Sequence, residues 1–179
     1  MHVFVTGQPG CGKTTLIKNM MSDPALSKLK MSGFITEECL DSTGTRIGFD
    51  VVTLDGKRGV LARKGGGKGP KTGQYTVDVS SFESLALHSL DLSQDVDIFI
   101  IDEIGRMELH SDKFKAGVDC ILDAKRPIFG SIAAARYGRG VPYCEDIKAR
   151  DDVLTLNLTK SNRNQIANEV AQALAHVLD

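Results

Sequence analysis

An eight-residue segment near the start of the chain, GQPGCGKT from Gly7 to Thr14, restricts the fold more than any other feature. It matches the pattern G-x-x-x-x-G-K-[ST] at every fixed position. Glycines allow backbone N–H groups to turn inward and approach phosphate oxygens closely. Lys13 would contact the β- and γ-phosphates, and the Thr14 hydroxyl would complete a Mg²⁺ coordination sphere. The predicted nucleotide-binding residues are Gly7, Gln8, Pro9, Gly10, Cys11, Gly12, Lys13, Thr14 and Thr15.

The residues on either side of this loop favour nucleotide binding over a chance glycine turn. Residues 2–6 (HVFVT) are a short β-rich run, as expected of a strand that leads into a phosphate loop. Leu16, Ile17 and Met20 then recur at helical spacing, which predicts a helix from about residue 12 to 21. The N-terminus of such a helix favours bound anions.

The next part of the chain is rich in β-forming residues and turns. Residues 33–40, 46–54 and 59–63 are strand-like, and an Asp-Gly pair between the last two is a strong hairpin signal. We therefore expect an antiparallel hairpin insert at about 33–63. The following stretch, 64–73 (KGGGKGPKTG), cannot pack a core, which predicts a flexible loop. It is either a plain surface connection or a basic flap that closes over phosphates.

Strands and helices alternate regularly after residue 74. The apolar run 96–101 is typical of a buried parallel strand. Helices are expected after a capping box at Ser80–Glu83 and after the caps Ser111 and Ser161. Alternation of this kind predicts an α/β fold with three layers, in which helices cover both faces of a mostly parallel sheet. Further strands are predicted at 75–79, 127–133 and 153–158, within a single domain of residues 1–179.

Composition excludes several classes of protein. The chain has 179 residues and a formal net charge of −1, so nothing in its charge suggests a nucleic-acid or membrane surface. The first strand begins at once, which leaves no room for a signal peptide, and no apolar run approaches the length of a membrane span. We expect a cytoplasmic protein, and a monomer, that binds nucleoside triphosphates such as ATP and GTP.

Four cysteines occur without C-x-x-C spacing: Cys11, Cys39, Cys120 and Cys144. We expect free thiols in a reducing compartment. Cys120 fits the apolar face of a helix, which favours core packing. Cys11 lies in the phosphate loop, where a helix N-terminus acidifies thiols, but the simpler interpretation is that it fills a variable loop position.

A second motif completes the expected active site. Residues 98–101 (IFII) are apolar and lead into the acids Asp102 and Glu103. A strand of this kind ends at the carboxyl edge of the sheet, where ligands bind in open α/β folds. Asp102 would hold Mg²⁺ opposite Thr14, and Glu103 would polarise a water in line with the γ-phosphate. The alternative for Glu103 is a solvated acid or a helix-terminus partner.

Other candidates depend on position alone. Glu108 is either a second acid of the site or an acid that suits the first turn of a helix. Ser131 lies on a strand expected between the loop strand and the acidic strand, where it is either a γ-phosphate sensor or a small core residue. Phosphoryl transfer also requires positive charge in the transition state. The candidates for this charge are Arg106, Arg136, Arg139, Arg150 and Arg163, and Asn162 is a further candidate near the nucleotide.

The segments GQPGCGKTTL, GFITEE, RIGFDVVTLDGKRG, GQYTVDVSSFE, IDEIGRMEL and LTKSNRN together resemble the cancer-related nucleoside-triphosphatase family of small P-loop NTPases. The resemblance implies a RecA-like P-loop fold and slow, Mg²⁺-dependent hydrolysis of nucleoside triphosphates with loose base preference. Gly7–Thr15, Asp102, Glu103 and Gly105 match the family's motifs, and Arg150 matches an arginine near its last strand. The segment 133–144 has no clear counterpart in the family.

Three functions follow from these residues. The first is an NTPase in which Lys13 and Glu103 are catalytic and Thr14 and Asp102 hold Mg²⁺. The second is a nucleotide or nucleoside kinase, for which the Glu37-Glu38 pair would hold an acceptor. The third is a nucleotide-dependent switch protein, in which hydrolysis resets a conformational state.

Overall fold

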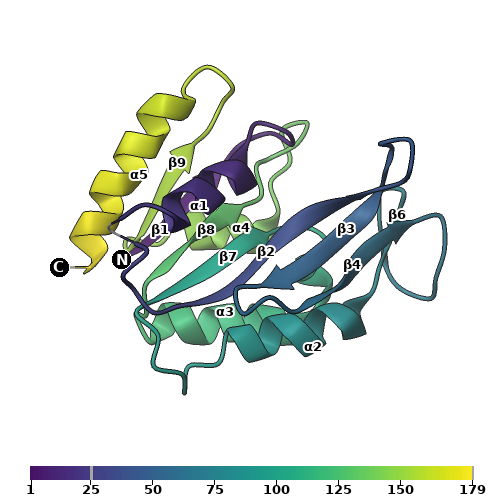
Figure 1. Ribbon diagram of the computed structural model, residues 1–179, viewed down its shortest axis with the longest axis horizontal. Helices are drawn as coiled ribbons and strands as arrows, with labels where there is room; N and C mark the ends of the chain where they lie inside the picture. The colour runs from purple at the N-terminus through teal and green to yellow at the C-terminus, as the bar shows by residue number, and fades with distance from the viewer. Residues whose placement is uncertain (25, 179) are drawn as a thin grey trace.

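The protein is described here by a computed structural model that covers residues 1–24 and 26–178. Within these residues, nine strands form one mixed sheet with helices on both faces (Figure 1). The strands are β1 (His2–Thr6), β2 (Met31–Leu40), β3 (Arg46–Thr53), β4 (Arg58–Lys64), β5 (Lys71–Thr72), β6 (Tyr75–Val77), β7 (Ile98–Ile104), β8 (Ile128–Ile132) and β9 (Val153–Asn157). The helices are α1 (Lys13–Met21), α2 (Val79–Ser89), the 3₁₀ turn η1 (Glu108–His110), α3 (Asp112–Asp123), α4 (Pro142–Lys148) and α5 (Arg163–Leu178).

The order of the strands across the sheet is β5-β6-β4-β3-β2-β7-β8-β1-β9. Strands β2, β7, β8, β1 and β9 are parallel, as the alternating pattern predicts. Strand β2 belongs to both halves of the sheet: its start, from Met31 to Phe34, pairs with β7, and Phe34 to Leu40 pairs with β3. The expected hairpin at 33–63 is therefore an antiparallel extension of the same sheet, which continues through β4, β6 and β5.

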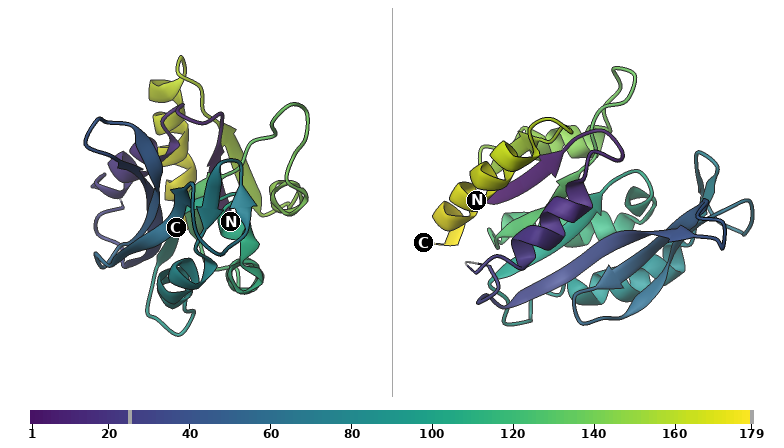
Figure 2. Two further views of the ribbon diagram at one scale, coloured as in Figure 1. Left: turned by 90° about the vertical axis from the view of Figure 1, so that its right-hand side faces the viewer. Right: turned by 45° about the horizontal axis from the view of Figure 1, so that its top comes forward.

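Alternating side chains along the strands form two hydrophobic cores. Phe4 points to the core under α2, α3 and α4, whereas Val3 and Val5 point to the core under α1 and α5. Figure 2 shows the helices on opposite sides of the sheet, so the chain has the three layers that the sequence predicts. Two aromatic side chains, Phe82 and Phe114, pack edge-on against each other with ring centroids 5.1 Å apart. No helix among the described residues is long and apolar enough to cross a membrane.

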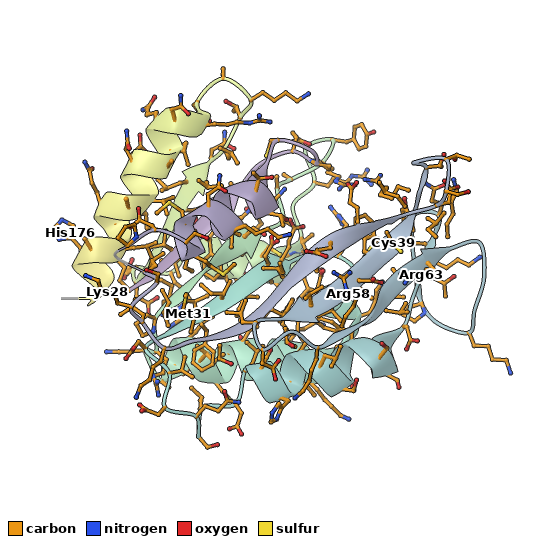
Figure 3. The ribbon with its side chains drawn as sticks, in the orientation of Figure 1. Lys28, Met31, Cys39, Arg58, Arg63 and His176 are labelled. Atoms are coloured by element: carbon orange, nitrogen blue, oxygen red, sulfur yellow. The ribbon has the colours of Figure 1, made fainter. Side chains whose placement is uncertain are left out.

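Ion pairs hold the antiparallel extension in shape. Asp50 of β3 lies between Arg58 and Arg63 of β4, at 3.0 Å and 2.6 Å between nitrogen and oxygen. The two arginines are labelled together with Cys39 of β2 in Figure 3. Because Asp50 is buried, both contacts compensate a charge that would otherwise be costly in the interior. These ion pairs thus link β3 to β4 in the antiparallel extension beside the parallel strands.

Two local predictions were wrong. Helix α2 begins at Val79 with Asp78 as its N-cap, whose carboxylate accepts a hydrogen bond from the Ser81 backbone N–H at 2.9 Å, so Ser80–Glu83 is not the capping box. Cys120 is exposed, because the buried stripe of α3 consists of Phe114, Val118, Ile121 and Leu122. The predicted Ser111 cap of α3 is confirmed, since its hydroxyl accepts from the Phe114 N–H at 3.0 Å.

Candidate functional site

A cavity of about 820 Å³ opens at the carboxyl edge of the sheet, where β1, β7 and β8 end. One side is the phosphate loop with the start of α1. Residues at the end of β7 and residues of the segment after β8 also line it. Residues of the antiparallel extension form the wall farthest from the phosphate loop. Ligand sites of open α/β sheets lie at this edge, because the loops that leave the parallel strands meet there.

The phosphate loop has the backbone that its glycines predict. Gly10 and Gly12 have φ values of +76° and +106°, a region that only glycine adopts without strain. The Lys13 ammonium donates a hydrogen bond to the Gly7 carbonyl at 3.0 Å, which holds it over the loop. The cavity is lined by Gly7, Pro9, Gly10, Gly12, Lys13, Thr14 and Thr15 of the predicted set.

The two remaining loop residues direct their side chains elsewhere. Cys11 is buried and packs in the core beneath α1 and α5. Gln8 donates from its amide to the Ala135 carbonyl at 3.4 Å, which links the loop to the segment after β8. The simpler interpretation of Cys11, a filler of the loop, agrees with its burial.

Asp102 lies at the end of β7 beside the phosphate loop, with 1% of its surface exposed. The Thr14 hydroxyl donates to one carboxylate oxygen at 2.6 Å, and the Ser131 hydroxyl donates to the other. Burial raises the pKa of Asp102, and the two hydroxyl donors oppose this shift. Ser131 stands on β8 between β7 and β1, as predicted, and touches Asp102 directly.

Glu103 and Glu108 form the acidic side of the cavity. Glu103 lies 3.4 Å from the Lys13 ammonium, and burial raises its pKa while Lys13 lowers it. Burial, together with the nearby Glu103 charge, raises the pKa of Glu108 well above its ordinary value. Gly105 lets the two acids meet, because a Cβ there would be 2.6 Å from Glu103 Oε1 and 3.0 Å from Glu108 Oε2. Glu108 is therefore a second acid of the site.

The structure places the remaining predicted residues, five arginines and Asn162, in different surroundings. Arg106, Arg136 and Arg163 line the cavity, and Arg163 donates from Nε to the Cys11 carbonyl at 3.0 Å. Asn162 accepts from the Thr159 N–H at 2.7 Å and so shapes the loop before α5. The remaining candidates, Arg139 and Arg150, do not line this cavity among the described residues.

The placement of Arg150 beside the nucleotide was wrong. Its guanidinium pairs with Asp152 at 2.9 Å and with Asp123 at 3.5 Å. Arg150 precedes β9, whose Val153 is in register with His2 at the start of β1. It therefore lies at the amino edge of the parallel strands, opposite the phosphate loop.

Sequence reasoning missed the far wall of the cavity. Arg46 lies over the rings of Phe49 and Tyr75, with its guanidinium carbon 5.2 Å and 6.0 Å from their centroids. It also donates to the Tyr75 hydroxyl at 3.0 Å and to a Glu38 carboxylate oxygen at 2.9 Å. No motif marks these residues, since they meet only when β6 pairs with β4 and β4 pairs with β3.

Comparison with known proteins agrees with this geometry. A family model described as NTPase matches residues 2–171. The chain is 42% identical over 179 residues to the human cancer-related nucleoside-triphosphatase, covering 94% of each chain. It is 39% identical over 177 residues to the nucleoside-triphosphatase THEP1 of Thermotoga maritima, covering 97% of this chain and 95% of that protein.

Solved structures agree as well. THEP1 from Aquifex aeolicus matches with a TM-score of 0.81 at 32% identity, covering 97% of this chain and 99% of that one. The solution structure of a human cancer-related nucleoside triphosphatase matches with a TM-score of 0.80 at 41% identity, covering 97% and 96%. The match over nearly the whole length includes the antiparallel extension as well as the phosphate loop.

Proposed function

The chain belongs to the NTPase family, and on that premise we propose that it hydrolyses nucleoside triphosphates to diphosphate and phosphate, with Mg²⁺ and loose base preference. The observation that carries the proposal is the contact between the two motifs. Thr14 of the phosphate loop donates to Asp102, and Lys13 lies 3.4 Å from Glu103. One charged loop and two acids thus surround the space where a γ-phosphate would lie.

The residues present suit Mg²⁺. The hydroxyl of Thr14 and the carboxylate of Asp102 are hard oxygen donors in contact with each other, at the mouth of the phosphate loop. Asp102 is buried, and no arginine or lysine among the residues that the structure describes forms an ion pair with its carboxylate, so a cation there would compensate its charge. When bound, the ion would neutralise charge that develops on the β- and γ-phosphate oxygens.

The chain's own groups supply the remaining chemistry. The loop amides and Lys13 hold the β- and γ-phosphates and stabilise the charge that grows on them during transfer. Glu103 orients a water toward the γ-phosphorus and accepts its proton, and burial favours this role by raising the pKa of Glu103.

The test is phosphate release from ATP, GTP, CTP and UTP, with Mg²⁺ or with chelator. We expect Glu103→Gln to lower kcat by about 10²–10⁴-fold, because a general base is lost, while nucleotide binding persists. Lys13→Ala should abolish binding or turnover. Normal hydrolysis by Glu103→Gln would refute the role of Glu103, and turnover in chelator would refute the role of Mg²⁺.

One observation favours a second candidate, phosphoryl transfer to a hydroxyl acceptor. The cavity continues past the acids to the wall of Arg46, Phe49 and Tyr75, which is more space than a water requires. A planar acceptor such as a nucleoside would stack there. Diphosphate formation that exceeds phosphate release when nucleosides are added would support transfer. Equal amounts of the two products would support hydrolysis alone.

A further inference from the structure

The segment between β8 and α4 forms a small hairpin over the cavity. The Arg136 N–H donates to the Arg139 carbonyl at 3.1 Å, and the Arg139 N–H donates back at 2.9 Å. Tyr137 and Gly138 between them have φ values of +52° and +72°, which are typical of a two-residue hairpin turn. Figure 2 shows this green loop extending beyond the end of the sheet.

The hairpin stands above the gap between the phosphate loop and the acids. It follows β8, which lies between β7 and β1, and its first residue, Ala133, donates to the Ile104 carbonyl at 3.0 Å. On the other side, Gln8 of the phosphate loop donates to the Ala135 carbonyl. The hairpin therefore bridges the two motifs on the side where Lys13 and Glu103 meet.

Three arginines gather at this hairpin. Arg136 and Arg139 are directly opposite each other in the antiparallel bridge, so their side chains leave the same face. Arg106 donates from Nη2 to the Arg139 carbonyl at 3.4 Å. Like charges in this cross-strand position repel each other. Among the described residues, no ion pair joins any of the three to a carboxylate, in contrast to Arg46, Arg58, Arg63 and Arg150.

Arginines that line a cavity without a carboxylate ion pair favour an anion as their partner. The cavity is lined by Arg136 and Arg106 and also contains the phosphate loop. An anion held by Lys13 and the loop amides would lie in the same cavity as Arg136. Arg163 also lines the cavity, but its Nε already donates a hydrogen bond to the Cys11 carbonyl at 3.0 Å.

We propose that the hairpin is an arginine arm, in which Arg136 contacts the γ-phosphoryl group during transfer and Arg139 and Arg106 position the arm. This inference rests on the proposed hydrolysis and names the residue that supplies its positive charge. The bond between the γ-phosphorus and the β,γ-bridging oxygen breaks, and the water oxygen bonds to phosphorus. The proton passes to Glu103, and Arg136 stabilises the charge on the equatorial oxygens without taking part in bonding.

The test compares Arg136→Ala, Arg136→Lys and Arg150→Ala in steady-state hydrolysis. Arginine fingers supply about 10³–10⁵-fold in rate, so we expect Arg136→Ala to lower kcat at least about 10²-fold, with KM changed less than about three-fold. Arg136→Lys should recover only part of the loss, because lysine is a point charge. Arg150→Ala, which removes an arginine at the opposite edge, should leave kcat unchanged.

A binding readout separates this arm from a structural role. The wild-type protein with ADP, Mg²⁺ and aluminium fluoride should form a stable transition-state complex, and Arg136→Ala should bind ADP but lose the complex. A kcat for Arg136→Ala within three-fold of wild type, or retention of the fluoride complex, would overturn the arm. If wild type releases no phosphate at all, the proposed hydrolysis fails instead. In that case the arm is tested by binding alone. Loss in Arg136→Ala of a wild-type preference for a non-hydrolysable triphosphate over ADP would support the arm, and an unchanged preference would overturn it.

Discussion

Replacing Ser131 with alanine tests how the buried carboxylate at the centre of the site is held. Ser131 is fully buried on β8, and its hydroxyl donates to Asp102. The change removes one oxygen and leaves Asp102 with the Thr14 hydroxyl as its side-chain hydrogen-bond donor among the described residues. A hydrogen bond to a charged group contributes about 1.5–3 kcal/mol. We expect Ser131→Ala to lower the free energy of unfolding by about that amount.

Ser89→Ala is the matched control. Ser89 is also buried, but its hydroxyl donates to the Ala86 carbonyl of its own helix at 2.8 Å. A neutral hydrogen bond of this kind contributes about 0.5–1.5 kcal/mol. Both variants thus remove a hydroxyl oxygen from a buried serine. Only Ser131→Ala removes a hydrogen-bond donor from a carboxylate.

The loss of stability in Ser131→Ala should depend on pH, because it depends on the ionisation of Asp102. Burial raises the pKa of Asp102 in the folded protein, so its ionised form lowers stability as pH rises through that pKa. Loss of the Ser131 donor raises the pKa further. The stability difference between wild type and Ser131→Ala should therefore grow as pH rises through the raised pKa of Asp102, whereas that of Ser89→Ala should not change with pH.

Urea unfolding in chelator, across a series of pH values above the ordinary carboxylate range, measures these free energies for the wild type and the two variants. Equal losses for the two variants, or a loss for Ser131→Ala that does not change with pH, would refute the reasoning. Either result would mean that the Ser131 hydroxyl does not support an ionised Asp102.

Two further predictions concern the histidine at the start of β1 and the cysteines. Burial and the N-terminal amine lower the pKa of His2 from 6.5 to about 4, so the unfolded chain binds more protons between these values, and stability falls as pH is lowered through them. Urea unfolding should show a loss of about 2 kcal/mol from pH 7 to pH 5 that is missing in His2→Leu; an equal loss in both proteins would contradict this. A thiol reagent followed by mass spectrometry should label exposed Cys120 in the native protein and spare buried Cys11 and Cys144, whether or not nucleotide is present; rapid labelling of Cys11 would contradict its packing in the core.

The half of the site formed by contiguous motifs could be predicted from the sequence. The phosphate loop sets its own backbone through glycines, and the strand that ends in Asp102 delivers the acid to the same edge as the loop. Parallel strands all end at the same edge of the sheet. The alternation of strands and helices therefore predicts that Asp102 and the phosphate loop lie together. The same direction argues against Arg150, because a residue that precedes a parallel strand lies at the opposite edge.

The other half depends on contacts between distant segments. Arg46, Phe49 and Tyr75 come together through the pairing of β3, β4 and β6, which alternation along one strand does not specify. Cys120 failed for a related reason, because the apolar face of α3 is decided by the four larger side chains that pack on the sheet. The capping error at Ser80 arose because Asp78 competes for the same helix start and its carboxylate is the better placed acceptor.

The division of the site into two halves also divides its chemistry. The contacts that we propose between the phosphate loop and the triphosphate are the same in hydrolysis and in transfer. Whatever selects water over another acceptor must lie on the far side of the γ-phosphate, where Glu103, Glu108 and the wall of the antiparallel extension face the cavity. Strand β2 links that wall to the sheet, since it pairs with β7 at one end and β3 at the other. A change of acceptor would therefore arise from substitutions on the extension, such as at Arg46, and would leave the phosphate loop unaltered.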